Sequence, residues 1–335
     1  MHEQNPLQVQ FTSPNQRERR LPLVLIHDGG GTSFTYFLLD SLHRDVWAIH
    51  NPHYHTGEVW PGGMVEMARH YIGLMLMAGL SGPILLGGWS LGGLLALTIS
   101  QILAKRPRSK VSVAGLLLVD SPHHTPWSEL AVPTSKPDLG KVPELVQRSF
   151  DNCQGLLDTW KLLPWDRPTC GGKSVYVTVA DEKFHLRSNE VIYKPARGQW
   201  RTMETRTFDG IHMLSRQPIS PPPAVLIKCV QHVPAQGSAN DPYQVDLLRD
   251  EPLLGWEGHH LEFIKAVIEA DAHHYNIFQF PNITQITKQL NEGLEILDSL
   301  RVLEPEIKGN AQACCHDFSV GKQQSGEIST ALQKN

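Results

Sequence analysis

The sequence predicts an α/β protein whose mostly parallel, doubly wound sheet is covered by helices on both faces. Two observations support this fold class. Short apolar runs rich in Leu, Ile and Val alternate with longer helical segments through the first 120 residues. The runs lack the polar–apolar alternation of half-exposed strands, which indicates strands buried on both faces, as in parallel sheets.

The expected elements follow one another in a regular order. Strands are predicted at Leu21–Asp28, Val46–Pro52, Gly82–Ser90 and Val111–Ser121. The first strand ends in a glycine-rich loop and the second ends at a proline, both of which commonly stop strands. Between the strands, the segments 34–43, 62–79 and 91–105 are predicted to be helices, and in 62–79 the apolar residues recur at helical spacing.

The regular alternation stops after Asp120. Residues 123–222 are proline-rich and irregular, with an amphipathic segment at 142–163 and a strand-like run at 173–180. About 100 residues are too many for an ordinary loop, so they are expected to form a lid. The α/β pattern then resumes at Ala224–Val230 and Leu261–Ala270, before a last helix at 283–303.

These segments predict four parts of the chain. Residues 1–20 form a polar N-terminal arm, residues 21–122 and 223–307 the core, residues 123–222 the lid, and residues 308–335 a polar tail that is expected to be disordered.

Composition excludes several classes of protein. The chain has 335 residues, 41% of them hydrophobic, and a formal net charge of −4, which suits a soluble protein with one large core and is too small a charge to indicate nucleic-acid binding. The N-terminus is too polar for a secretory signal, and no apolar run approaches the length of a membrane span. The five cysteines lack metal-ligand spacing, so we expect reduced thiols, no metal site and a cytoplasmic location.

A serine between two apolar segments is the first candidate for chemistry. Gly88-Trp89-Ser90-Leu91-Gly92 matches G-x-S-x-G, a turn in which a strand reverses into a helix and holds the serine at positive φ. The amide of Leu91 and the helix dipole could then stabilise a developing oxyanion. The pattern also arises by chance, but here an apolar strand precedes it and an apolar helix follows it. The sequence therefore predicts an α/β-hydrolase fold, with Ser90 as the nucleophile and the lid inserted after the strand that follows the nucleophile helix.

Activation of a serine hydroxyl requires a base, and the base requires an acid that orients it. In this fold the chain order is Ser, acid, His. Asp120 ends the strand after the nucleophile helix, at the same edge of the sheet as Ser90, and is the preferred acid; the alternative for it is a turn or capping role. Asp241 and Asp246 follow the next core strand and are rivals, and Asp181 is a weaker one.

The base is expected on the loop after the last core strand. That loop carries His273 and His274, and we choose His274 within the pair. Four other histidines in pairs lie off this loop and rank lower: His123, His124, His259 and His260.

A second oxyanion donor is expected from the loop after the first strand. The loop His27–Gly31 is rich in glycine, so its amides can approach a substrate closely, and the amide of Asp28 or Gly29 is the candidate. A phosphate-binding loop is the alternative, but the segment lacks both G-x-G-x-x-G and the Lys-Ser/Thr of a P-loop.

Four separate blocks, at 23–42, 82–93, 115–122 and 254–278, resemble the thioesterase domains that release products from fungal polyketide and nonribosomal peptide synthases. The resemblance extends from about residue 21 to residue 303 and is loose in the lid. In that family, G-W-S-x-G-G carries the nucleophile and matches Ser90, and D-S-P carries the acid and matches Asp120. The histidine before an aromatic residue matches His274, and His273 stands where the family usually has Asn or Asp.

The resemblance implies an acyl chain that arrives on the phosphopantetheine arm of a carrier protein and leaves by hydrolysis or cyclisation. No cofactor of the enzyme itself is implied. The chain lacks the carrier-protein motif G-x-D-S-L and has polar ends, so we expect a free-standing enzyme that acts in trans on an acyl carrier protein or synthase. Five lid residues are expected to enclose the acyl chain: Trp127, Phe150, Leu156, Leu157 and Trp160.

Two other functions fit the same residues. A carboxylesterase or an acyltransferase that acts on a small secondary metabolite would use the same three groups, because they do not distinguish oxygen from sulfur leaving groups. A catalytically silent carrier-binding protein is the third reading.

Overall fold

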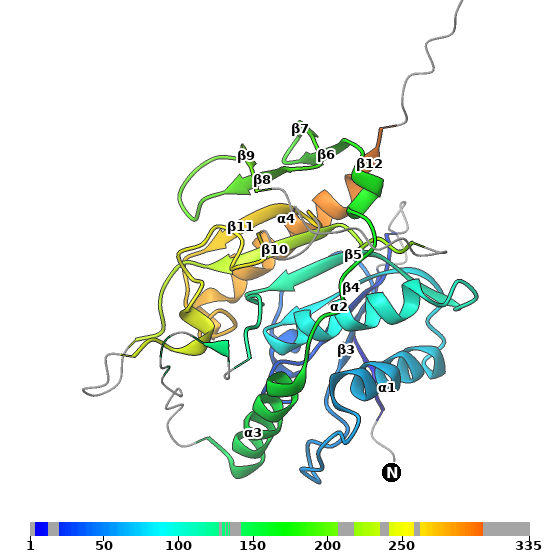
Figure 1. Cartoon of the computed structure of the whole chain (residues 1–335), viewed down its shortest axis with the longest axis vertical. Coiled ribbons are helices and arrows are strands. Elements are labelled where there is room, and N and C mark those ends of the chain that lie inside the picture. The colour runs from blue at the N-terminus through cyan, green and yellow to red at the C-terminus, as the bar shows by residue number, and fades with distance from the viewer. Residues whose placement is uncertain are drawn as a thin grey trace, which may run out of the picture. The chain divides into compact units, whose positions relative to one another are not determined.

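The computed structural model describes residues 4–12, 20–126, 129–130, 132, 134, 142–206, 218–234, 241–257 and 262–303. In this part of the chain, nine strands form one sheet in the order β1-β3-β2-β4-β5-β10-β11-β8-β9 (Figure 1). Seven of them run parallel: β3 (Val46–Ile49), β2 (Leu23–Ile26), β4 (Gly82–Trp89), β5 (Val111–Val119), β10 (Ala224–Cys229), β11 (Ile264–Ala270) and β8 (Glu190–Lys194). The two edge strands, β1 (Leu7–Gln10) and β9 (Arg201–Glu204), are antiparallel to their neighbours.

Helices cover both faces of this sheet. Val24 and Ile26 of β2 belong to the apolar cluster that includes α1 (Gly63–Met77) and α2 (Leu91–Ala104), whereas Leu23 and Leu25 belong to the cluster that includes α4 (Ile283–Ser299). Successive side chains of a strand point to opposite faces, so the two clusters are separate cores on the two sides of the sheet. The predicted α/β class and its doubly wound sheet are confirmed.

The segment expected to be a lid is only partly one. Its second half supplies β8 and β9 to the main sheet, and β6 (Val175–Val179) and β7 (Glu182–Leu186) form a small antiparallel sheet with β12 (Arg301–Val302). The small sheet packs on α4 through β6. The boundary 123–222 is therefore wrong as a lid boundary, because β8 is a short strand whose residues Val191, Ile192 and Tyr193 are buried beside β11. What remains for a cover is the first half, with α3 (Glu144–Thr159).

Two smaller expectations also differ from the structure. The N-terminal arm is not merely polar, since β1 pairs with β3 at the sheet edge. Residues 34–43 form only a 3₁₀ turn, Phe34–Phe37, rather than a helix. The reason is the spacing of the buried side chains Tyr36, Leu39 and Leu42, which recur every three residues and lack the 3-and-4 spacing of an α-helix. The tail 308–335 lies outside the described residues.

No helix within the described residues is long and apolar enough to cross a bilayer. The described cysteines, Cys153, Cys170 and Cys229, are free thiols.

Candidate active site

Ser90 occupies a sharp turn between β4 and α2. Its φ is 55° and its ψ is −118°, so the positive φ expected from the sequence is confirmed. Close approach of backbones explains the flanking glycines. A Cβ added at Gly88 would lie 2.4 Å from the carbonyl oxygen of Ile26, and one at Gly92 would lie 2.3 Å from the same atom. Both positions therefore require glycine, and the turn leaves the serine hydroxyl at the carboxyl edge of the sheet.

The structure brings Ser90, Asp120 and His274 together at that edge. The hydroxyl of Ser90 lies 3.0 Å from Nε2 of His274, and Nδ1 of His274 lies 2.7 Å from Oδ2 of Asp120. Asp120 directly follows β5 and is fully buried, and His274 follows β11 and is 2% exposed. The ring can accept the serine proton on Nε2 while Nδ1–H donates to the carboxylate, which is the arrangement of a catalytic triad.

The alternatives for the acid lie elsewhere. Asp181 sits in the turn between β6 and β7, and Asp241 is exposed. Asp246 is buried in the short 3₁₀ helix Gln244–Asp246, where its carboxylate accepts hydrogen bonds from Arg249 and from the amide of Val233.

The alternative histidines that the structure describes make other contacts. His273 accepts the amide of Tyr275 on its Nδ1. His124 bonds through Nε2 to the carbonyl of Leu157, and His123 stacks edge-on against Trp256. His259 and His260 lie outside the described residues.

A buried arginine that the sequence did not indicate holds the acid. Nη1 of Arg249 lies 2.5 Å from Oδ1 of Asp120, and Nη2 lies 2.9 Å from Oδ2. The amide of Cys229 is a second donor to Oδ1, at 2.9 Å. Burial by itself raises the pKa of Asp120, but the hydrogen bond from His274 and the charge of Arg249 outweigh it and hold that pKa well below its usual range. The acid is therefore a fixed carboxylate.

The loop after β2 lies beside the triad and is held by a second buried histidine. His27 donates from Nδ1 to the carbonyl of Asp28 at 2.5 Å and accepts the hydroxyl of Tyr71 on Nε2 at 2.6 Å. Burial, partly offset by the bond to Asp28, lowers the pKa of His27 to about 4, so this ring is neutral at physiological pH. The amide of Gly31 also donates to Asp28. These bonds fix the backbone that carries the candidate amides of Asp28 and Gly29.

The side chain of Asp28 is an unusual feature of this loop. Burial raises the pKa of this carboxyl to about 6, although amide donors, chiefly that of Gly30, and the nearby charge of His274 act in the opposite direction. Because the Asp28 amide is one of the donors to its own carboxylate, Gly29 is the better candidate for an oxyanion donor. Leu91 is the first residue of α2, so its amide has no partner within the helix.

Helix α3 covers this loop. A Cβ added at Gly29 would lie 3.1 Å from both Cys153 and Phe150, and the hydroxyl of Ser149 donates to the carbonyl of Gly29 at 3.0 Å. Phe150, predicted to line the substrate site, thus packs over the loop that carries the candidate amides.

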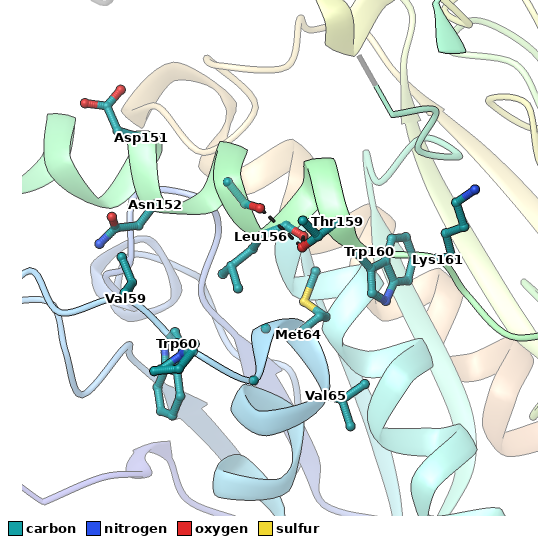
Figure 2. Close-up of a pocket in the computed structure, with 14 residues that line it drawn as sticks. Val59, Trp60, Met64, Val65, Asp151, Asn152, Leu156, Thr159, Trp160 and Lys161 are labelled. Atoms are coloured by element: carbon teal, nitrogen blue, oxygen red, sulfur yellow. Dashed lines mark hydrogen bonds between the residues drawn. The ribbon is translucent and has the colours of Figure 1, made fainter. Parts of the chain in front are cut away.

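Two cavities flank α3. One has a volume of about 310 Å³ and contains Ser90, Leu91 and Leu157 in its wall. The rest of its lining is mixed, with apolar residues such as Leu94, Leu130 and Leu248 beside the polar His123, His124, Thr125, Glu129 and Gln244. The other is a groove of about 870 Å³ between α1 and α3, where Trp60 and Met64 face Leu156 and Trp160 (Figure 2).

The predicted lid residues are thus divided between two places. Leu157 lines the cavity at the serine, whereas Leu156 and Trp160 line the separate groove. Trp127 lies outside the described residues. The lining of the cavity at Ser90 is mainly apolar, with several polar side chains among the apolar ones.

The chain is similar to known thioesterases. Residues 21–152 match the family model of the thioesterase domain. A probable thioesterase, KK1J of Curvularia clavata, is 46% identical over 89% of this chain and 97% of its own length. The chain belongs to the thioesterase family. A second relative, the probable thioesterase lcsE of Purpureocillium lilacinum, is 41% identical over 89% of this chain and 98% of its own.

A solved structure, the NocB thioesterase domain from the nocardicin cluster, has 18% identity and a TM-score of 0.48 over 82% of this chain and 93% of its own. The protein itself has the α/β-hydrolase fold, because it combines a mostly parallel sheet with a strained serine turn between a strand and a helix.

Proposed function

We propose that the protein releases an acyl chain from a carrier protein by way of an ester on Ser90. The observation that carries the proposal is the pair of contacts made by one imidazole, 3.0 Å to the serine hydroxyl and 2.7 Å to a fixed carboxylate. A hydroxyl and a base within hydrogen-bond reach, with the base oriented by a third group, are the requirements for nucleophilic catalysis.

In the first half-reaction, the Ser90 oxygen attacks the thioester carbonyl and Nε2 of His274 takes the hydroxyl proton. The amides of Leu91 and Gly29 donate to the tetrahedral oxyanion, and loss of one such donor costs about 3 kcal/mol of barrier. The C–S bond then breaks, and the proton on Nε2 passes to the departing thiolate. The free thiol leaves, and the acyl group stays on Ser90.

In the second half-reaction, water or a hydroxyl of the acyl chain attacks the ester, with His274 again taking the proton. The acid or lactone leaves when the Ser90 oxygen recovers the proton from Nε2. The cavity of about 310 Å³ beside Ser90 is the place for the acyl chain. Its mainly apolar lining suits an acyl chain, and the polar side chains in that lining offer hydrogen-bond partners to oxygen functions on the chain. The carrier-protein substrate rests on the resemblance to synthase thioesterases.

The test compares an acyl-N-acetylcysteamine thioester with the p-nitrophenyl ester of the same acyl group. We expect a higher kcat/KM for the thioester, and we expect Ser90→Ala to lower it by about 10⁴-fold or more. The matched control is Ser100→Ala, which removes a buried hydroxyl of α2 that donates to the carbonyl of Ala96 at 2.7 Å. A preference for the oxygen ester would indicate the carboxylesterase, and full activity of Ser90→Ala would contradict the mechanism.

A further inference from the structure

Arg249 donates all of its side-chain hydrogen bonds to groups next to the triad acid. Its side chain is completely buried, and all five of its N–H groups have acceptors. Nη1 donates to Asp120 and to the carbonyl of Cys229, and Nη2 donates to Asp120 and to the carbonyl of Val245. Nε lies 3.0 Å from Oδ1 of Asp246. The guanidinium is therefore fixed in one orientation, and it in turn fixes both oxygens of Asp120.

A guanidinium in contact with the triad acid creates an electrostatic difficulty. The acid acts by stabilising the positive charge that the imidazole acquires when it takes the serine proton. A positive charge paired with both oxygens of Asp120 cancels most of that effect. Asp246 removes the difficulty, because two carboxylates and one guanidinium leave a net charge of −1, the charge of a lone aspartate. Asp246 is itself 5% exposed, so solvent screens it little.

We propose that Arg249 and Asp246 act together as positioning residues for the triad. Arg249 holds Oδ2 of Asp120 toward Nδ1 of His274, and Asp246 supplies the negative charge that Arg249 would otherwise cancel. This inference rests on the proposed function, because it requires that His274 is the base that takes the proton of Ser90.

Other charged or titratable groups surround the same imidazole. Asp28 lies on the loop after β2, Lys228 and Cys229 lie on β10 near Asp120, and His273 and Tyr275 flank His274. None of them is altered in the variants below, so their contributions are the same in every comparison.

A purely structural role for the pair predicts a different result. If Arg249 only tied the segment 243–254 to the sheet, every substitution would lower stability, and the pH dependence of catalysis would not move. The charge argument instead predicts shifts of opposite sign for the two single variants, which a loss of stability cannot produce.

The experiment measures kcat/KM for an acyl thioester, and the rate of fluorophosphonate labelling at Ser90, as functions of pH. Both quantities rise with pH as His274 loses its proton. The midpoint of each profile is the pH at which the quantity reaches half of its plateau value. In Asp246→Asn the cluster becomes neutral, so His274 loses its proton more readily, and the midpoint falls by about half a pH unit. In Arg249→Met the cluster carries two negative charges, and the midpoint rises by about one unit.

Two further variants separate charge from position. In the double variant Arg249→Met/Asp246→Asn the net charge is again −1, and the midpoint returns to near its wild-type value. In Arg249→Lys the positive charge is kept, but the bidentate hydrogen bonding to Asp120 is lost. The midpoint therefore stays in place while the plateau rate falls about tenfold.

The matched control is a second arginine–aspartate pair, in which the buried Arg44 contacts Asp298 of α4, whose side chain is 25% exposed. Nη2 of Arg44 lies 2.6 Å from Oδ2 of Asp298, and Nη1 lies 3.2 Å from Oδ1. Arg44→Met and Asp298→Asn are expected to lower thermal stability without moving the midpoint.

The inference would be overturned if the midpoint shifted in the same direction in both single variants, or if the midpoint of the double variant did not return to near its wild-type value. If Arg249→Met does not fold, Asp246→Asn decides alone, since an unmoved or raised midpoint contradicts the charge argument. Failure of the proposed function gives a distinct result, because wild-type protein would then not be labelled at Ser90 at any pH.

Discussion

The edge of the sheet that carries the triad and the helix that covers it are built differently. At the edge, Ser90 and Asp120 both have positive φ, and Arg249 has every donor satisfied. Helix α3 is attached by few polar contacts, such as Ser149 to Gly29 and Asn152 to Gly57, and only two of its described side chains, Ser149 and Leu156, are buried. The triad therefore lies at a tightly constrained edge of the sheet, whereas under the proposed function the acyl chain contacts a cover that is held by fewer contacts.

The largest expected effect tests this contrast with the same substitution in both regions. Gly88→Ala would place a Cβ 2.4 Å from the carbonyl oxygen of Ile26, so β2 and the serine turn must separate. We expect the free energy of unfolding to fall by about 4 kcal/mol, with loss of activity. Chemical denaturation and thioester turnover measure both.

Gly155→Ala is the matched change in α3, where an added Cβ meets nothing within 4 Å. Alanine stabilises a helix interior by about 1 kcal/mol relative to glycine, so α3 should become more resistant to proteolysis. Equal losses of stability in the two alanine variants would contradict the contrast between edge and cover.

The next effect concerns Asp28, at the contact between the two regions. Its pKa is raised by burial from the ordinary 3.8 to about 6, so the folded protein holds this proton more tightly than the unfolded chain. Between about pH 4 and pH 6, stability therefore falls as pH rises, and the full penalty persists above pH 6.

Asp28→Asn removes this carboxyl. Relative to wild type, the variant should gain about 2 kcal/mol in free energy of unfolding between pH 4 and pH 7. Urea denaturation of both proteins at the two pH values measures the gain. If the difference in free energy of unfolding between Asp28→Asn and wild type is the same at both pH values, the pKa of the Asp28 carboxyl does not change on folding, which contradicts the prediction.

The smallest effect distinguishes the two cavities beside α3. Leu157→Ala removes apolar surface from the cavity at Ser90, so KM for a long-chain acyl thioester should rise about tenfold, with little change for an acetyl thioester. Leu156→Ala, one residue away, alters the groove of Figure 2 and should leave KM unchanged while lowering stability. The reverse pattern would place the acyl chain in the groove.

Local spacing explains what could be read from the sequence. Gly88, Ser90 and Gly92 lie within five residues, so their geometry is a property of one turn. Asp120 and His274 are far apart in sequence, but each follows a buried strand, and the ends of parallel strands meet at one edge. The core strands and the three contacting side chains were therefore predictable.

Tertiary packing explains what could not be read. Strand β8 contains only three consecutive buried residues, too few to show a period, and its partner β11 lies about 70 residues later in the chain. Arg249 lies on an irregular segment with no repeating pattern, and its burial depends on meeting Asp120 and Asp246 in the folded protein. A surface arginine and this one look alike in the sequence.

Intact-protein mass spectrometry detects the proposed ester on Ser90 itself. After brief incubation with an acyl thioester, the account predicts a mass increase equal to the acyl group, located on the peptide that contains Ser90 and absent from Ser90→Ala. Continued turnover with no such adduct, or an adduct on another side chain such as Cys153, would contradict it.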